Sequence, residues 1–332
     1  MIIDNQFTLI PNKFVLAKEQ MLQAFYDMLL IRRFEERCGQ LYGMGLIGGF
    51  CHLYIGQEAI VTATKLAKQT DDSVITSYRD HGHAILFGIE PRYVLAELLG
   101  KATGCSRGKG GSMHMFNIPG RFYGGHGIVG AQISLGTGLA FAAKYRATQN
   151  ISYTFLGDGA ANQGQMFESF NMAALWELPV VYIIENNEYA MGTSVTRSTK
   201  MTKLCNRGEG LGIQGIQANG MDLEHMYDVL AQASEFTRTY NCPLIIEAKT
   251  YRYRGHSMSD PAKYRTKEEV ELYKNTDPIN VIRTKLLEQH GVNLTIIQDI
   301  ENTVKATVAD AVEFAQNSPI PDQSELLTDV YI

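Results

Sequence analysis

Hydrophobic residues in this chain occur either in short continuous runs or in longer segments with helical spacing. Short apolar runs bounded by turn residues are typical of buried strands, whereas apolar positions three and four residues apart are typical of amphipathic helices. The pattern predicts strands at 73–77, 151–156, 179–184 and 243–249. It predicts helices at 17–42, 57–68, 91–99, 131–145, between the second and third strands, and at 223–238, 267–275, 278–290 and 295–316. This alternation favours an α/β fold with a doubly wound, mostly parallel sheet and helices on both faces.

The remaining stretches are predicted to lack regular structure. We expect a polar loop at 190–220, an exposed polar loop at 250–266 and an extended tail after Pro319. No linker, repeat or low-complexity segment interrupts the pattern. We therefore expect a single domain over 1–332, with an N-terminal helical arm at about 17–45 and a C-terminal helical region at about 267–332.

Two polar motifs stand at the ends of neighbouring predicted strands. Gly157-Asp158-Gly159 follows the strand at 151–156, and Asn186-Asn187 follows the strand at 179–184. Ligands of open parallel sheets bind at the carboxyl ends of the strands, so Asp158 and Asn187 are expected to lie close together. Their oxygens suit a Mg²⁺ ion that carries a diphosphate. Gly-Asp-Gly is also common in tight turns, but two asparagines after a buried strand are costly unless they bind something.

Residues 100–130 are rich in glycine and show almost no apolar periodicity. Such a long segment in a compact domain is more often functional than accidental. Residues 125–130 match the GxGxxG pattern of dinucleotide-binding proteins, which requires a preceding strand and an acidic residue about 20 positions later. We expect no strand before the motif, and no acidic residue occurs at 131–157. Glycines that let the backbone approach a ligand explain the pattern better, and residues 108–110 lack the spacing of a Walker A motif.

Basic residues also follow predicted strands. Arg79 follows the strand at 73–77, where it forms either a solvated salt bridge or a phosphate clamp, since guanidinium matches phosphate oxygens. The loop 251–261 is either merely basic and exposed or directs Arg254 or His256 at the same sheet edge. Histidines in polar, glycine-flanked contexts are His52, His81, His83, His114, His126 and His256. Their spacing does not support a zinc site.

Composition narrows the possible partners and compartments. The 332 residues carry a net charge of −5 without a long basic run, which gives no basis for nucleic-acid binding. The 5 cysteines lack CxxC pairing and indicate reduced thiols rather than disulfides or zinc. No apolar stretch reaches the length of about 18 residues that a membrane helix needs, and the arginine-free start matches neither a signal nor a transit peptide.

Taken together, the motifs resemble the alpha subunit of the thiamin-dependent pyruvate dehydrogenase component in its two-subunit form. The resemblance covers roughly residues 20–325. Its motifs are GFCHL at 49–53, GQEA at 56–59, YRDHG at 78–82, GKGGSMHM at 108–115, FYGGHGIVGAQ at 122–132, GDGAANQG at 157–164 and the loop 251–261. The resemblance implies the thiamin diphosphate-binding fold.

The resemblance also implies roles for individual residues. It implies three Mg²⁺ ligands: Asp158, Asn187 and the backbone carbonyl of Tyr189. The implied cofactor-binding residues are Tyr78, Arg79, Gly127, Val129, Asp158, Gly159, Ala160, Asn187 and His256. The implied substrate contacts are Phe50, His52, Tyr78 and Arg79, with Phe50 near the substrate methyl. His52 and His256 are the implied catalytic residues.

In the resembled family the cofactor lies between two kinds of subunit. The alpha chain binds its diphosphate half, and the pyruvate dehydrogenase beta subunit binds the pyrimidine half and supplies the activating glutamate. The resemblance therefore implies an α2β2 heterotetramer, with no activity from the alpha chain alone. The implied reaction is oxidative decarboxylation of pyruvate with reductive acetylation of a lipoyl group on dihydrolipoyl acetyltransferase, leading to acetyl-CoA and CO₂. We expect a cytoplasmic location in a bacterium, or the mitochondrial matrix if a transit peptide was removed.

Related enzymes are the alternatives. Branched-chain 2-oxo acid dehydrogenase alpha subunits depart from this chain at residues 50–52 and 111–114 and carry Glu at the position of Asp158, whereas acetoin dehydrogenase is harder to exclude. A non-catalytic paralogue is disfavoured because Asp158 and His256 are both present. Ser194, Ser257 and Ser259 match phosphorylated positions of eukaryotic members, but kinase control is not expected in a bacterial member.

Overall fold

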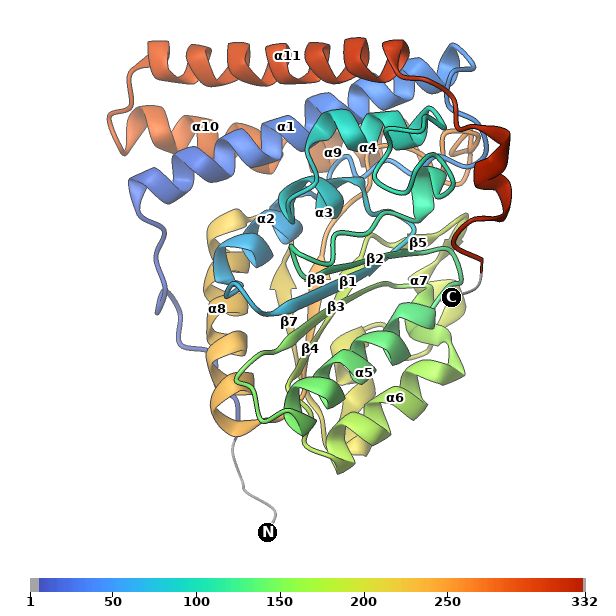
Figure 1. Ribbon diagram of the computed structural model, residues 1–332. Coiled ribbons are helices and arrows are strands. Elements are labelled where there is room, and N and C mark those ends of the chain that lie inside the picture. The colour runs from blue at the N-terminus through green and yellow to red at the C-terminus, as the bar shows by residue number, and fades with distance from the viewer. Residues whose placement is uncertain (1–5, 331–332) are drawn as a thin grey trace.

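The computed structural model describes residues 6–330 and has a parallel β-sheet at its centre (Figure 1). Within these residues the sheet has six strands in the order β2-β1-β3-β4-β8-β7, and each neighbouring pair is parallel. The strands are β1 (Ser73–Ser77), β2 (Phe122–His126), β3 (Ser152–Gly157), β4 (Val180–Asn186), β7 (Gln214–Asn219) and β8 (Leu244–Lys249). The sheet confirms the predicted α/β fold with doubly wound, parallel strands.

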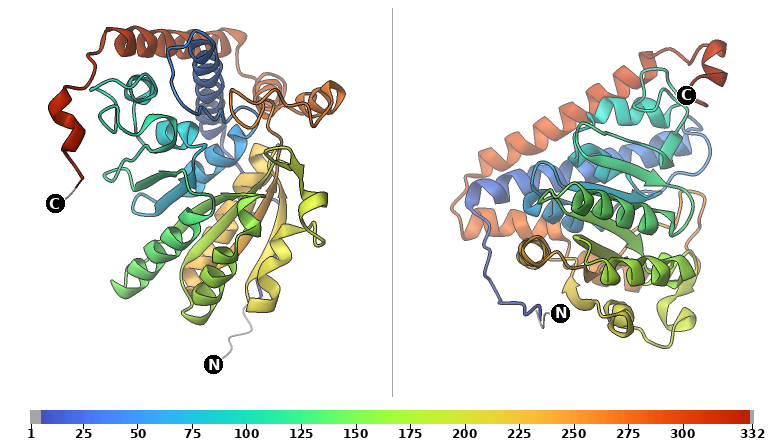
Figure 2. Two further views of the ribbon diagram at one scale, coloured as in Figure 1. Left: turned by 90° about the vertical axis from the view of Figure 1, so that its right-hand side faces the viewer. Right: turned by 60° about the horizontal axis from the view of Figure 1, so that its bottom comes forward.

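Helices cover both faces of the sheet (Figures 1 and 2). One face is covered by α5 (Ala131–Tyr145) and α6 (Gly164–Leu175). The other face is covered by α2 (Glu58–Ala67), α3 (His81–Leu86) and α8 (Leu223–Tyr240), and α4 (Pro91–Leu98) packs between α3 and α11. An outer layer consists of α1 (Lys18–Gly43), α10 (Pro278–Glu288) and α11 (Leu294–Asn317), and α9 (Lys267–Lys274) precedes α10 in the chain. Among the described residues, no helix combines the length and the apolar character needed to span a bilayer.

The two faces of the sheet bury separate sets of apolar side chains. In β4, Val181 and Ile183 belong to the core shared with α1, α2 and α8, whereas Tyr182 and Ile184 belong to the core against α5 and α6. A strand buried on both faces needs a continuous apolar run, which is why this strand was predictable. Each fully buried large apolar side chain contributes about 1.5–3 kcal/mol to folding.

The structure contradicts the expectation that no strand precedes the GxGxxG motif. Strand β2 runs into the motif and pairs with β1. Its apolar pattern is broken at Gly125, where a Cβ atom would lie 2.0 Å from Oδ2 of Asp80, so only glycine fits. The motif is therefore a strand–turn–helix after all, and the missing acidic residue is what still argues against a dinucleotide.

The predicted polar loop at 190–220 is also wrong, because it contains β7. This strand lies at the edge of the sheet and is half-exposed, so its sequence carries little apolar signal. The short elements around it are β5 (Tyr189–Ala190), β6 (Thr193–Ser194), α7 (Val195–Ser198) and η3 (Leu204–Leu211). Helix α3 was not predicted either. All of its residues are buried, but its two histidines and its glycine interrupt the apolar pattern that would indicate a buried helix.

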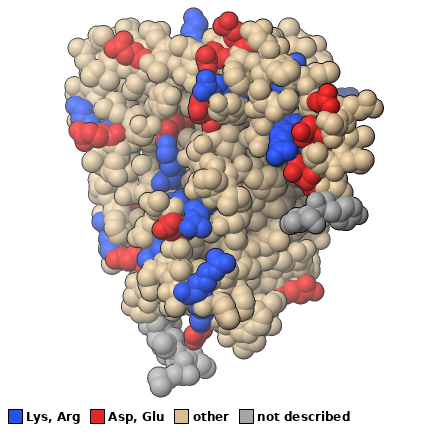
Figure 3. Space-filling view, in the orientation of Figure 1, with Lys and Arg blue, Asp and Glu red and all other residues tan. Residues whose placement is uncertain are grey.

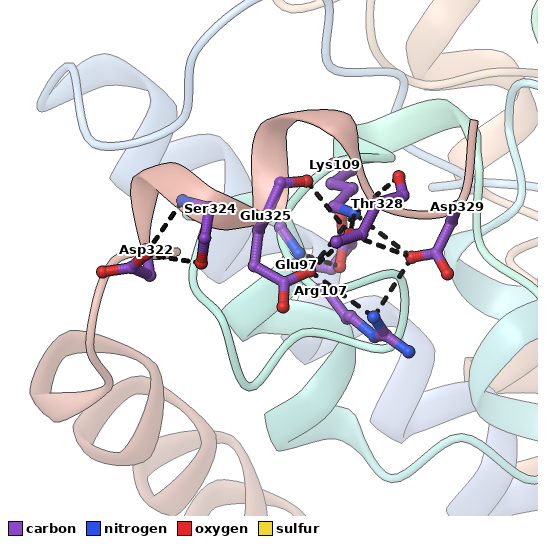
Figure 4. Close-up of polar contacts among 9 residues, drawn as sticks. Glu97, Arg107, Lys109, Asp322, Ser324, Glu325, Thr328 and Asp329 are labelled. Atoms are coloured by element: carbon purple, nitrogen blue, oxygen red, sulfur yellow. Dashed lines mark hydrogen bonds and ion pairs between the residues drawn. The ribbon is translucent and has the colours of Figure 1, made fainter. Parts of the chain in front are cut away.

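Two further expectations fail near the site. The loop 250–266 is not exposed at its start, since Tyr251 is buried and Arg252 is only 1% exposed. The tail after Pro319 is not fully extended, because it forms the 3₁₀ turn η4 (Gln323–Leu327). Figure 4 shows this tail paired with the glycine-rich segment, where Arg107 and Lys109 bind Asp329 at 3.1 and 3.2 Å.

A single buried carboxylate organises the glycine-rich segment. Glu97, on α4, accepts hydrogen bonds from the backbone amides of Ser106, Gly108, Gly110 and Gly111 at 2.7–3.0 Å. These bonds replace the regular backbone pairing that the segment lacks. The segment therefore has a defined path up to the short turn η1 (Gly111–Met113). A second short turn, η2 (Ala160–Asn162), follows β3.

Candidate functional site

The carboxyl ends of β1, β2, β3, β4 and β8 open into a cavity of about 850 Å³. The structure brings every residue that the resemblance implied for the site to the lining of this cavity. These residues are Phe50, His52, Tyr78, Arg79, Gly127, Val129, Asp158, Gly159, Ala160, Asn187, Tyr189 and His256. A cavity at this edge follows from the parallel sheet, since the loops that leave successive strands diverge there.

Three oxygen donors meet at the ends of β3 and β4. Asp158 is the first residue after β3, Asn187 is the first after β4, and Tyr189 begins β5. The Asn187 amide is fixed, because its Nδ2 donates to Oε1 of Gln57 at 2.8 Å and its Oδ1 accepts from Arg252 at 2.9 Å. Burial raises the pKa of Asp158 to about 6, although nearby Arg252 opposes the rise. A carboxylate, an amide oxygen and a carbonyl oxygen form a donor set that fits Mg²⁺.

Two buried arginines face the cavity without an acidic partner. Arg79 donates to the carbonyls of Leu53 at 2.7 Å and His256 at 2.8 Å. Arg252 donates to Asn187 Oδ1, to the Tyr189 carbonyl at 3.2 Å and to other neutral oxygens. Among the described residues, neither guanidinium has a carboxylate within ion-pair distance. Burial and the charge of Arg252 lower the pKa of Arg79 to about 10, so this side chain remains charged at neutral pH.

Two histidines lie side by side at the cavity wall. The ring centroids of His52 and His256 are 5.4 Å apart, and that of Tyr78 is 4.6 Å from His52. Burial, followed by the charge of Arg79, lowers the pKa of His52 to about 2 and that of His256 to about 3. Both rings are therefore neutral at pH 7, and both have a buried Nδ1 atom without a protein partner. A neutral imidazole with a free nitrogen can accept a proton from a bound substrate.

The positions that are expected to contact the cofactor through their backbone lie in two turns. Gly159 follows Asp158, and a Cβ atom at Gly159 would lie 2.6 Å from the Cβ of Ala190, so this turn requires glycine. Gly127 and Val129 follow β2, and Val129 is exposed at the rim. Phe50 stacks near His52, with centroids 6.2 Å apart, and is 62% exposed.

The sequence did not identify every residue of the site. Arg252, Gln57 and Tyr264 also line the cavity, whereas Arg254, which was considered for the site, does not. The alternation Tyr-Arg-Tyr-Arg marks a basic loop but does not show which arginine is buried. In the structure Arg252 Nη2 binds the Tyr264 hydroxyl at 3.1 Å, and this hydroxyl donates to Asp260 at 2.8 Å. Arg252 thus connects the proposed metal ligands to the loop that carries His256.

Within residues 6–330, one other cluster has the composition of a metal site. Ligand atoms of Glu35, Cys38 and His81 lie within 4.8 Å of one another. Both ring nitrogens of His81 are already engaged, by Glu35 and Ser112 at 2.8 Å each. No imidazole nitrogen is left for an ion, so this cluster does not fit a metal.

Comparison with known proteins agrees with this geometry. Residues 26–324 match the model of the family described as "Dehydrogenase E1 component". The chain is 64% identical over 321 residues to the pyruvate dehydrogenase E1 component subunit alpha of Rickettsia bellii (strain RML369-C), covering 97% of this chain and 98% of that protein. It is 56% identical over 317 residues to the subunit of the same name from Rhizobium meliloti (strain 1021), covering 95% and 91% of the two chains. A mitochondrial subunit alpha from Dictyostelium discoideum is 48% identical over 320 residues, which cover 96% of this chain and 84% of that protein.

These matches span nearly the whole chain and include the strand ends that carry the cavity residues. They confirm the resemblance drawn from the motifs. The chain therefore belongs to the dehydrogenase E1 component family, among its pyruvate dehydrogenase alpha subunits.

Proposed function

We propose that the chain is the alpha subunit of a pyruvate dehydrogenase and binds the diphosphate half of thiamin diphosphate together with Mg²⁺. Membership of the family implies the use of thiamin diphosphate. We infer that Asp158, Asn187 and the Tyr189 carbonyl hold the metal ion. Arg79 and His256 bind the diphosphate with Tyr78, and the amides of Gly159 and Ala160 contact it. The backbone of Gly127 and Val129 contacts the aminopyrimidine.

The observation that carries this proposal is that two buried arginines, Arg79 and Arg252, lack an acidic partner among the described residues. Burying a charge without a partner costs several kcal/mol, so proteins rarely keep one without a use. Arg79 and Arg252 are 5% and 1% exposed, and neither has an acidic partner among the described residues. A diphosphate would supply the missing negative charge, and Mg²⁺ would balance the buried Asp158. The free Nδ1 atoms of His52 and His256 support a polar ligand in the same cavity.

When bound, thiamin diphosphate supplies the nucleophile and the electron sink for decarboxylation of a 2-oxo acid. The chain's own residues orient the reacting groups and control protons. Burial, and then the charge of Arg79, holds His52 and His256 in the neutral form, so a proton that either ring accepts is readily passed on. Phe50 stands at the open side of the cavity, where it contacts the substrate and excludes water.

A beta subunit is the partner that the exposed surface favours. Figure 3 shows few charged side chains over α5 and α6. The exposed apolar residues here, including the neighbouring cavity rim, are Ile128, Val129, Leu135, Phe141, Tyr145, Phe167, Met172, Leu175 and Trp176. The patch is continuous with the cavity at Val129, where we place the pyrimidine half of the cofactor. We therefore place the beta subunit on this patch in an α2β2 assembly, in the bacterial cytoplasm, with dihydrolipoyl acetyltransferase as acceptor of the acetyl group.

Co-expression with a beta subunit tests the proposal. The purified assembly is expected to decarboxylate pyruvate with an artificial electron acceptor and to turn over acetoin much more slowly. The reverse preference would favour acetoin dehydrogenase. Asp158→Ala is expected to abolish Mg²⁺-dependent cofactor binding in calorimetry, whereas Asp310→Ala, at an exposed position of α11, should leave binding unchanged. If Asp158→Ala keeps the affinity of the unmodified assembly, the metal assignment is wrong; if the unmodified assembly binds no cofactor, a non-catalytic role is favoured.

A further inference from the structure

We propose that Glu35, His81 and Ser112 act together as positioning residues that fix the segment carrying His52 against the cavity. The three residues come from separate parts of the chain: Glu35 lies on α1, His81 begins α3, and Ser112 lies in the turn η1. None of them lines the cavity. The role rests on the proposed function only in so far as His52 faces the reacting centre.

The chain of contacts is continuous and buried. Nδ1 of His81 donates to Oε2 of Glu35 at 2.8 Å, and Nε2 of His81 lies 2.8 Å from the Ser112 hydroxyl. Glu35 and His81 are fully buried, and Ser112 is nearly so. Desolvation lowers the pKa of His81, but the Glu35 carboxylate and its hydrogen bond more than offset this, so the net effect raises it. A protonated His81 donates to both neighbours and leaves the Ser112 oxygen as an acceptor.

The two end residues of this hydrogen-bonded network, Glu35 and Ser112, both bind the backbone of the segment that precedes α2. The backbone amide of His52 donates to Oγ of Ser112 at 3.4 Å. The backbone amide of Tyr54 donates to Oε1 of Glu35 at 2.8 Å. The segment therefore has two buried amides, two residues apart, whose acceptors are side chains of the same buried chain of contacts. Amides in such a segment have no strand or helix partner, so these side chains are what satisfies them.

The arrangement has the residue types of a hydrolytic triad but cannot act as one. A nucleophilic serine must reach a substrate, whereas Ser112 is 5% exposed and only its neighbour Met113 lines the cavity. The serine instead faces inward, toward His81 and the His52 amide. Its place is fixed by the glycine-rich segment, because Glu97 holds the amides of Gly110 and Gly111 just before it. The glycine-rich segment therefore has a second role besides close approach to a ligand, which is to position Ser112.

Positioning by this chain of contacts has consequences that can be measured. Loss of the Ser112 hydroxyl leaves the His52 amide without an acceptor, so the segment relaxes and the imidazole shifts. Misplacement of a reacting group by about 1 Å can lower a rate by about 100-fold. Neither Arg79 nor the proposed metal ligands Asp158 and Asn187 contact Ser112. Arg79 binds the Leu53 carbonyl of this segment, but its second hydrogen bond, to the His256 carbonyl, does not involve the segment, so cofactor affinity should change little.

The experiment compares Ser112→Ala with Ser234→Ala in the assembly with the beta subunit. Ser234 is a matched control, since it is also a buried serine, but its hydroxyl contacts Tyr153 and Leu230 outside the cavity. For Ser112→Ala we expect amide exchange at residues 50–55 to accelerate at least tenfold and kcat to fall at least tenfold. Cofactor Kd should change less than threefold, and Ser234→Ala should change none of these quantities.

Variants of Glu35 add a graded readout. Glu35→Gln keeps an acceptor for the Tyr54 amide, and its NH₂ group can donate to Nδ1 of a neutral His81 that donates to Ser112 through Nε2. It should therefore lose less kcat and less amide protection than Glu35→Ala. The proposal is overturned if Ser112→Ala leaves exchange at residues 50–55 unchanged, or if its kcat stays within twofold of the parent. Exchange does not depend on turnover, so an assembly that lacks pyruvate decarboxylation would refute the proposed function and still decide the positioning role.

Discussion

Replacing Arg79 by methionine should raise the stability of the cofactor-free protein while weakening cofactor binding. Arg79 is buried, charged and without an acidic partner among the described residues. Burial is the main cause that lowers its pKa to about 10, well below the usual range of a guanidinium, and this difference corresponds to a cost of about 3 kcal/mol for the charged form. The depressed pKa lies far above neutrality, so the side chain is charged in both folded and unfolded states below about pH 10 and the cost is constant there.

The gain is smaller than this cost, because methionine cannot replace the hydrogen bonds to the Leu53 and His256 carbonyls. Each lost bond costs about 1 kcal/mol, which leaves a net stabilisation of about 1 kcal/mol. For a chain of this size the change corresponds to a rise in Tm of about 2 °C. Loss of a charged hydrogen bond to phosphate should weaken cofactor binding by about 2 kcal/mol, or about 30-fold.

The assay is thermal unfolding of the alpha–beta assembly at fixed concentration, with and without saturating thiamin diphosphate and Mg²⁺. Arg79→Met should melt above the parent without cofactor and below it with cofactor, because ligand stabilisation follows affinity. Arg238→Met is the matched control: Arg238 makes two hydrogen bonds to buried Asp72, at 3.0 and 2.8 Å, so its loss should lower Tm by several degrees without changing cofactor affinity. A lower Tm for cofactor-free Arg79→Met would refute the reasoning that an unpaired cation is kept for an anionic ligand.

Other predictions concern packing, pH and the loop after β8. Gly136→Ala should cost about 1–3 kcal/mol, since its Cβ would lie 2.0 Å from Oγ1 of Thr154, whereas Gly138→Ala, with open space around it, should gain about 0.5–1 kcal/mol in thermal unfolding of the purified chain. Burial raises the pKa of Asp80 from 3.8 to about 8, so between these values the folded state holds a proton that the unfolded state has lost. Stability should therefore fall as pH rises from 6 to 8, and denaturant titrations of Asp80→Asn should show a slope weaker by up to about 1.4 kcal/mol per pH unit; an equal slope would contradict the assignment. Ser257→Glu places negative charge in the cavity lining and should raise the cofactor Kd at least tenfold, with Ser257→Ala within twofold of the parent; unchanged activity of Ser257→Glu would argue against charge repulsion.

The central strands were predictable because their burial leaves a direct trace in the sequence. Strands β3, β4 and β8 lie inside the sheet, are buried on both faces and read as continuous apolar runs. Once these strands are placed, the polar residues that follow them must meet at one edge, which is why Asp158 and Asn187 could be paired. The edge strands β2 and β7 are only partly buried, so no comparable trace exists for them.

The supporting residues of the site were not predictable, because their roles depend on contacts between distant segments. Arg252 reads as one arginine of a basic loop, and only the folded chain shows that it is buried against Asn187, 65 positions earlier. His81 reads as one of several histidines, and its partners Glu35 and Ser112 are 46 and 31 positions away. Local sequence specifies which groups stand at strand ends, but it does not specify which side chains hold them there.

The glycines of the GxGxxG motif show why a short pattern identifies a physical need rather than a ligand. Gly125 is required because Asp80 fills the space of a side chain, and Gly130 is required because its φ of 91° begins α5 in the left-handed region. Gly127 lines the cavity, with only the His114 ring close to the position of a Cβ atom. A dinucleotide site and the backbone contact proposed for the aminopyrimidine both bring a ligand close to a turn between a strand and a helix, so they share these glycines. The charged residues around the motif distinguish the two kinds of site. The acidic residue that would bind a ribose is absent from the sequence that follows the motif, whereas the buried Arg79 and Arg252, which follow β1 and β8, line the cavity.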